Sequence, residues 1–222
     1  MRTKITSISA ALLCAAAASP AFAQARTAPG GPYSLLSGTT VPTGTDVVSG
    51  EFGWPSATFG FTHGMSPTSD VGFKFDLLFG FEDTTNSQFG IGFRVPFRFM
   101  IHRRDRLSIL AHVDPGIKIY TTNPALFGFQ WPVGLTVGYA ANPDLNVAFG
   151  FELPMTLEVT GPGPSPVQMF LGPMFGPAFE YHLPSDRRMT VGFNTRFGPI
   201  FSTKGGGGQF AFVTQVLLAY RL

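Results

Sequence analysis

The sequence has one cysteine, little charge and no long apolar run. Cys14 lies near the N-terminus, so the rest of the chain has neither a disulfide nor a thiolate metal site. Charged residues make up 13% of the chain, against about 25% in an average soluble protein. No later stretch approaches the ~18 uninterrupted apolar residues of a transmembrane helix. These absences argue against a disulfide scaffold, an ordinary soluble surface and a helical membrane protein.

The N-terminal residues have the three parts of a secretory signal peptide. Arg2 and Lys4 form a basic start, residues 5–18 form an apolar core, and Ala21-Phe22-Ala23 is an A-x-A cleavage site. The sequence therefore predicts a signal peptide at 1–23, which is cleaved on export. The remaining 199 of the 222 residues are a suitable length for one domain.

The exported chain has no net formal charge. The sequence has fifteen Lys and Arg and thirteen Asp and Glu, and cleavage of the signal peptide would remove two of the basic residues, Arg2 and Lys4. Thirteen residues of each sign remain, so nothing in the charge balance favours nucleic acid as a partner.

Short segments alternate strictly between large apolar residues and small or polar ones. Successive side chains of a strand point to opposite faces, so each such segment predicts a strand with one apolar face. When strands are assigned this way, 22 of the 24 phenylalanines fall on the apolar face, and the exceptions are Phe22 and Phe170. One segment has its apolar residues at Val71, Phe73, Phe75, Leu77, Phe79 and Phe81.

Turn-forming residues separate nine such segments, as expected for hairpins. Residues 24–44 are rich in Gly, Pro and Thr, and they hold at most one short strand, near 33–38. A switch in the alternation at Trp54-Pro55 predicts a β-bulge inside the first long segment. The nine segments cover about 47–63, 70–82, 88–102, 107–120, 126–140, 145–159, 167–182, 189–202 and 209–222.

Alternation alone leaves open which face is buried. An exported soluble barrel or sandwich buries its apolar face, and it remains the alternative. Here the other face consists of glycine with a few charges, and each segment exceeds the ~9–11 tilted residues that cross a bilayer. Without an apolar helix, only a closed barrel can span a membrane. The sequence therefore predicts an all-β fold, a transmembrane antiparallel up-and-down β-barrel over residues 45–222.

This pattern resembles the small bacterial outer-membrane β-barrels of the opacity-protein and porin-like superfamily. The resemblance implies a Gram-negative outer-membrane location, contact with outer-membrane lipids, and handling by periplasmic chaperones and the barrel-assembly machinery. Members typically end in an alternating strand with a terminal aromatic residue, whereas here Tyr220 precedes a terminal Leu222. Such barrels have an even number of strands and periplasmic termini. We therefore expect a monomer of ten strands, the first near 33–38, with eight strands as the alternative.

The face opposite the phenylalanines carries most of the expected interior charge. Buried charges need partners, because an unpaired one costs several kcal/mol. We therefore predict an ion-paired, structural lumen, with a narrow porin-like channel for small solutes as the alternative. Arg94, Asp114, Glu152 and Arg196 are expected at one level, and Glu51, Glu82, Glu158, Glu180 and Arg221 also lie on this face. The predicted network consists of Lys74, Asp76, Arg94, Arg98, Asp114, Lys118, Glu152 and Arg196.

Two further expectations concern the rim and catalysis. Tyr139, Tyr181 and Tyr220 fall near the periplasmic ends of their strands and predict an interfacial aromatic girdle. Ser108 and His112 share a face but lie roughly 13 Å apart along a strand, beyond the contact that nucleophilic catalysis needs. The chain is therefore not expected to be an enzyme, and an outer-membrane lipid hydrolase is the weakest alternative. No cofactor or metal is predicted.

Overall fold

A computed structural model describes residues 33–81, 84–122, 125–159, 167–203 and 208–222 of the chain. The protein is all-β, with 72% strand, and the described residues form no helix. No described helix therefore has the length and apolar character needed to cross a membrane. The strands are β1 (Asp46–Trp54), β2 (Ser56–Ser66), β3 (Ser69–Phe81), β4 (Thr84–Arg94), β5 (Phe97–Arg104), β6 (Leu107–Val113), β7 (Gly116–Tyr120), β8 (Leu126–Gln130), β9 (Val133–Ala140), β10 (Leu145–Leu153), β11 (Met155–Val159), β12 (Val167–Leu171), β13 (Met174–His182), β14 (Met189–Ser202) and β15 (Gln209–Arg221).

All fifteen strands belong to one antiparallel sheet, so the predicted count of ten, or eight, is wrong. Prolines account for much of the difference, because a proline has no N–H to donate to the ladder. Five long segments each become two strands, with the breaks at Pro96, Pro115, Pro132, Pro154 and Pro173. Proline carbonyls still accept across the breaks. Pro96 accepts from Gly72 N–H, Pro115 from Val95 N–H and Pro132 from Asp114 N–H, at 2.8 to 2.9 Å.

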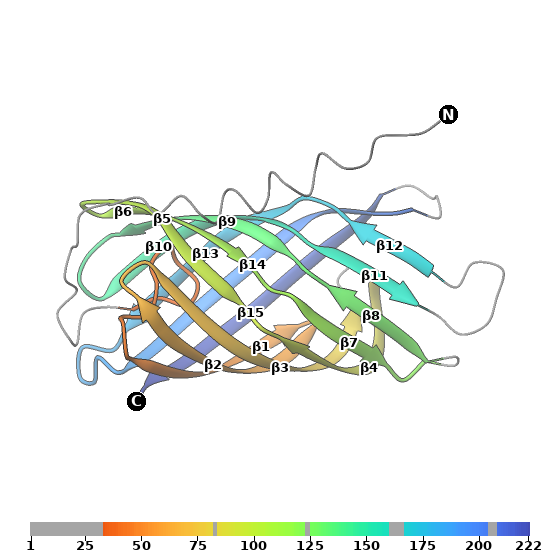
Figure 1. Ribbon diagram of the computed structural model, residues 1–222, viewed down its shortest axis with the longest axis horizontal. Coiled ribbons are helices and arrows are strands. Elements are labelled where there is room, and N and C mark those ends of the chain that lie inside the picture. The colour runs from red at the N-terminus through yellow and green to blue at the C-terminus, as the bar shows by residue number, and fades with distance from the viewer. Residues whose placement is uncertain (1–32, 82–83, 123–124, 160–166, 204–207) are drawn as a thin grey trace.

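Two extra pairings make the sheet close on itself. β3 pairs with β5 as well as β4, and β14 pairs with β12 as well as β13. One closed path runs through β3, β2, β1, β15, β14, β13, β10, β9, β6 and β5 and returns to β3. A second path shares β3, β2, β1, β15 and β14 with the first and returns to β3 through β12, β11, β8, β7 and β4. Each of these two paths passes through ten strands, and a third path that uses both extra pairings passes through twelve. Figure 1 shows the strands tilted along one elongated body.

The N-terminal part differs from the sequence prediction in two ways. Residues 33–38 form no strand. The expected bulge at Trp54-Pro55 is instead a tight hairpin, with a cis peptide bond, in which β1 pairs with β2 up to Phe52↔Ala57. The first strand of the sheet is therefore β1, and it pairs with the C-terminal strand β15.

The two faces of the sheet differ in character. Sixteen phenylalanines are among the exposed large hydrophobic residues, while the buried polar set includes Asp76, Arg98, Lys118, Glu180 and Arg196. In β13, buried and exposed residues alternate without a break. Phe170, expected on the opposite face, packs against the buried Met174 cluster. The observed exposure therefore follows the predicted alternation, with apolar residues outward and charged residues inward.

Candidate functional site

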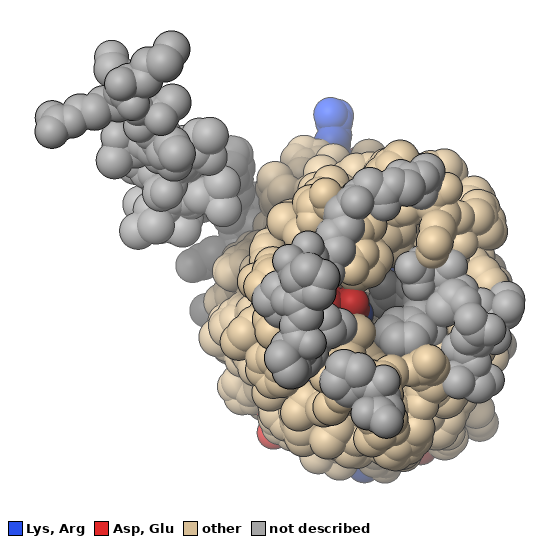
Figure 2. Space-filling view, turned by 90° about the vertical axis from the view of Figure 1, so that its right-hand side faces the viewer, with Lys and Arg blue, Asp and Glu red and all other residues tan. Residues whose placement is uncertain are grey.

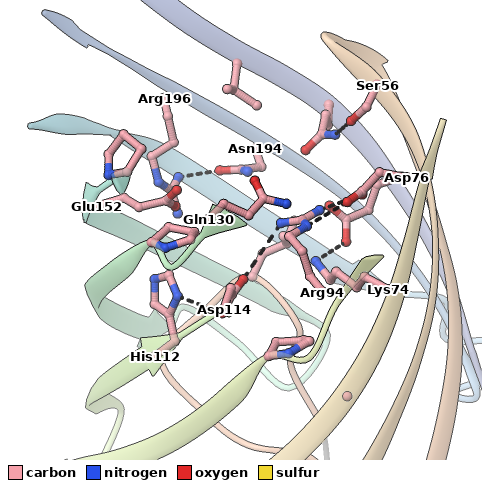
Figure 3. Close-up of a pocket in the computed structure, with 18 of the residues that line it drawn as sticks. Ser56, Lys74, Asp76, Arg94, His112, Asp114, Gln130, Glu152, Asn194 and Arg196 are labelled. Atoms are coloured by element: carbon pink, nitrogen blue, oxygen red, sulfur yellow. Dashed lines mark hydrogen bonds and ion pairs between the residues drawn. The ribbon is translucent and has the colours of Figure 1, made fainter. Parts of the chain in front are cut away.

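The charged inner face lines one cavity of about 160 Å³. The eight residues of the predicted network all line it, although they come from six strands and the β6–β7 connection. Figure 3 shows the central members pointing toward one another from opposite walls. The eight residues therefore face one interior space. The structure adds their pairing.

Arg94 and Asp76 form the central ion pair. The guanidinium donates two hydrogen bonds to the carboxylate, Nε to Oδ2 at 2.8 Å and Nη2 to Oδ1 at 2.7 Å. Thr58 adds its hydroxyl to Oδ1 at 2.6 Å. This forked geometry fixes direction as well as charge. On the other side of Arg94, Nη1 lies 3.8 Å from Asp114 Oδ2, and Asp114 Oδ1 lies 3.2 Å from His112 Nδ1.

Two lysine pairs flank this centre. Lys74 Nζ donates to Glu51 Oε1 at 2.6 Å, and Lys118 Nζ lies 3.2 Å from Glu158 Oε1. Lys118 also lies 5.6 Å from the centre of the Tyr120 ring, within cation–π range. Glu51 and Glu158 were expected on the inner face but outside the network, and the structure makes both of them direct partners of network residues.

Arg196 and Glu152 are less completely paired. Arg196 donates through Nη1 to the Asn194 carboxamide and to the Thr195 carbonyl. Its buried Nε has no partner in the described part of the chain, and Glu152 makes no ion pair with a described residue. The expected four-residue level is therefore split into two pairs: Arg94 lies 3.8 Å from Asp114, and Figure 3 shows Glu152 beside the Arg196 guanidinium. A Cβ on Gly150 would lie 2.5 Å from Arg196 Nη2, so this glycine makes room for the guanidinium.

Residues 33–41, here called the N-terminal segment, lie inside the closed sheet. The sequence had predicted a strand of the sheet itself at 33–38. Glu180 holds this segment through its carboxylate. Oε1 accepts from the N–H of Leu35 at 2.7 Å and of Leu36 at 3.0 Å. Oε2 accepts from the Ser34 hydroxyl at 2.5 Å and from Ser37 N–H at 3.1 Å. The sequence placed Glu180 inward but gave no sign that its partner would be backbone.

The ion pair of Arg98 and Asp70 holds the same segment from the opposite wall. Arg98 donates to Asp70 through Nε at 2.7 Å and through Nη2 at 2.5 Å. The guanidinium also donates to the Ser34 and Leu35 carbonyls, both at 2.9 Å, and Asp70 Oδ2 accepts from Val41 N–H at 2.7 Å. Sequence reasoning missed Asp70 because it closes a turn. Glu180, Asp70 and Arg98 are called the clamp below.

Apolar contacts complete the seat of the N-terminal segment. Tyr33 and Val41 are fully buried in a cluster with Val47, Leu217 and Ala219. The Tyr33 hydroxyl donates to the Arg188 carbonyl at 3.1 Å, and burial raises the pKa of this phenol above its ordinary value. A Cβ at Gly38 would meet Ser108 Oγ at 2.6 Å, so this close approach needs glycine.

The predicted girdle tyrosines lie at the same end as the clamp. Tyr139 and Tyr181 are exposed and lie across the sheet from Val147 and Leu145 of β10. Tyr220 is half-buried near the end of β15, and Arg188 Nη1 donates to its hydroxyl at 3.3 Å. The structure therefore places the tyrosines near one rim.

The residues weighed for catalysis do not form a nucleophile–base pair. Ser108 donates its hydroxyl to the Gly138 carbonyl at 3.4 Å, whereas His112 contacts Asp114. Among the described residues, no group of three His, Cys, Asp or Glu side chains could hold a metal ion. Searches of protein-family models and of curated proteins found no match to this sequence.

Proposed function

We propose that this chain is an integral β-barrel of a Gram-negative outer membrane, exported through a cleaved signal peptide, with a structural, ion-paired lumen. The inverted distribution of residues carries the proposal. Apolar side chains cover the outside of a closed sheet, and salt bridges fill the inside. In water this arrangement would expose a continuous apolar surface, which soluble monomers avoid.

Strand geometry and backbone pairing support the same proposal. β14 and β15 have 14 and 13 residues, more than the ~9–11 tilted residues that cross a bilayer. Lipid offers no hydrogen bonds to the backbone, so a spanning sheet must have no free edge. The closing pairs β3–β5 and β12–β14 meet this requirement. The proposal keeps the resemblance to the opacity-protein and porin-like superfamily and makes the lipids of that membrane the partner of the outer face.

The interior supports a structural role. Arg94, Lys74 and Lys118 each pair with a carboxylate from another strand. Each of these pairs joins a strand to its neighbour or to the next strand but one in the sheet, and so fixes the relative positions of those strands. One observation favours the alternative, a narrow passage for small solutes, because the same charges line a cavity with room for water.

The proposal is tested by folding and by a charge scan of the outer face. We expect the exported chain to fold into detergent micelles or vesicles and to run as a compact band that shifts when heated before electrophoresis. Phe151 lies on the outer face near the middle of the consecutive strands β10 and β11, whereas Phe210 lies at the start of β15. We expect Phe151→Arg to cost about 2–4 kcal/mol of folding free energy in lipid and Phe210→Arg about 0–1. Equal small costs, or a water-soluble monomer without lipid, would contradict the proposal.

A further inference from the structure

We propose that the N-terminal segment is a displaceable plug, and that the lumen behind it is a closed passage for ions and small polar solutes. This inference rests on the proposed membrane function and goes beyond it. In a purely structural lumen the clamp would only stabilise the fold, whereas here it also keeps the plug in its closed position.

The clamp binds the backbone of the N-terminal segment from both sides. Glu180 takes three consecutive N–H groups and one hydroxyl, while Arg98 takes the two carbonyls of Ser34 and Leu35. Such recognition is that of a binding site for a bent peptide segment, whose consecutive N–H groups converge on one carboxylate, with charge-assisted bonds at each contact. The occupant is the chain's own residues 33–41.

The closed sheet does not depend on this segment for its pairing. Among the described residues, strand pairing begins at Asp46, and no backbone–backbone hydrogen bond of the kind that joins strands involves residues 33–41. Between its apolar ends at Tyr33 and Val41, the segment is held by polar side chains that water could solvate if it left. A seat with this polar middle favours exchange between a seated and an unseated state more than a wholly apolar, interdigitated core does.

The cavity lies directly behind the segment. Leu35, Leu36 and Ser37 line it at one end, and Pro55, Ser56 and Gln215 line it toward the other. Figure 2 looks into the end opposite the clamp and shows a hollow in which an acidic side chain is visible. The segment therefore closes an interior that is hollowed at its other mouth. A narrow bore lined by paired charges suits ions and small hydrophilic solutes rather than large ones.

The test weakens the clamp in the full exported chain and measures both plug and passage. Glu180→Gln keeps the shape of the side chain but replaces one acceptor oxygen by an NH₂ donor, which then faces the donors of the segment. The matched control is Glu158→Gln, since Glu158 is also a buried carboxylate of the inner face but pairs with Lys118. Ser34→Ala, which removes the hydroxyl on Glu180 Oε2, serves as the second opening variant.

Plug position is read with a thiol at Ser37. This side chain is 3% exposed, and the chain has no cysteine after Cys14, so Ser37→Cys gives a single buried thiol in the exported protein. We expect a membrane-impermeant maleimide to label it about tenfold faster or more when Glu180→Gln or Ser34→Ala is added, because a buried thiol reacts only when its segment opens. Glu158→Gln should leave the rate unchanged.

Passage is read as single-channel conductance in planar bilayers, on protein first shown to be folded by its heat-induced gel shift. We expect the unchanged protein and Glu158→Gln to be mostly silent, and the two clamp variants to show frequent discrete openings. Fast labelling with no openings would overturn the passage, and unchanged labelling in both clamp variants would overturn the plug. If the unchanged chain does not fold into membranes at all, the proposed function itself is contradicted and this inference fails with it.

Discussion

The clamp end of the interior and the region around Arg196 differ in how completely their charges are paired. Both oxygens of Asp70 and both oxygens of Glu180 accept hydrogen bonds, and each side chain is fully buried. Arg196 is also buried, yet its Nε lacks a partner among the described residues. Complete pairing identifies charges that hold a structure in place. Incomplete pairing leaves a buried polar atom whose lost hydration is not offset by a partner among the described residues.

The largest loss of folding free energy is expected at the clamp. Arg98→Ala leaves the Asp70 carboxylate buried without its guanidinium, and breaking a buried pair on one side costs about 3–5 kcal/mol. Urea unfolding of the vesicle-inserted protein measures the loss. Arg103→Ala is the control, because Arg103 is exposed near the β5–β6 turn. A loss below about 1 kcal/mol at Arg98 would mean that water reaches Asp70 in the folded state.

A smaller loss is expected at the central pair. Arg94→Ala removes two charge-assisted bonds from Asp76, but the Thr58 hydroxyl stays on that carboxylate and the cavity admits water. We expect about 2–3 kcal/mol in the same unfolding assay, from the range for hydrogen bonds to charged groups. A cost equal to that of Arg98→Ala would remove the proposed difference between the clamp and the centre.

A still smaller loss of folding free energy is expected at Asp114. Its closest approach to Arg94 is 3.8 Å, and its firmer contact is with His112 at 3.2 Å. Asp114→Ala should therefore cost about 1 kcal/mol, the value for one ordinary hydrogen bond. The double variant Arg94→Ala/Asp114→Ala should lose nearly the sum of the two single losses. A coupling energy above about 1 kcal/mol would show that the two residues act as one unit.

The smallest effect is expected at Arg196. Arg196→Ala removes the bonds to Asn194 and Thr195 but also removes a buried charge with an unpartnered Nε. These contributions offset in part, and we expect the smallest loss of the series, below the ~1 kcal/mol of one ordinary hydrogen bond. A loss comparable with that at Arg94 would place Arg196 in the paired network after all.

The sequence predicted the two faces well because strand alternation is local. Phe175, Phe179 and Tyr181 of β13 are exposed, and Glu180 between them is buried, as their positions in the repeat require. The same reasoning brought the eight network residues to one cavity. Face assignment needs only the order of residues within each strand.

The pairing of the charges could not be predicted, because it depends on the stagger between strands. Arg94 and Asp76 lie on neighbouring strands with the register Asp76↔Gly92, and nothing in either segment fixes that offset. Strand stagger also explains why Arg94 and Arg196, expected at one level, belong to separate groups of charges. Height counted from the turns blurs by a few residues in a tilted sheet.

The two N-terminal errors have different physical reasons. Residues 33–38 were expected to form a strand of the sheet, whereas the additional strand comes from the first long segment, which turns at Trp54-Pro55 and forms β1 and β2. That turn has no Asn-Gly or Asp-Gly signal. The seat of the N-terminal segment depends on Glu180 and Arg98, more than 60 residues away along the chain. No local pattern reports such a contact.

The central claim is that the phenylalanine face lies in lipid and the charged face does not. The most direct test places tryptophan at position 151 and measures its quenching by lipids brominated near the bilayer centre, as the difference from the unchanged protein with Trp54 and Trp131. We predict that quenching of the Phe151→Trp signal is strong with bromine at the centre of the bilayer and weaker with bromine near the headgroups. Quenching by aqueous iodide with none by brominated lipid would contradict the claim.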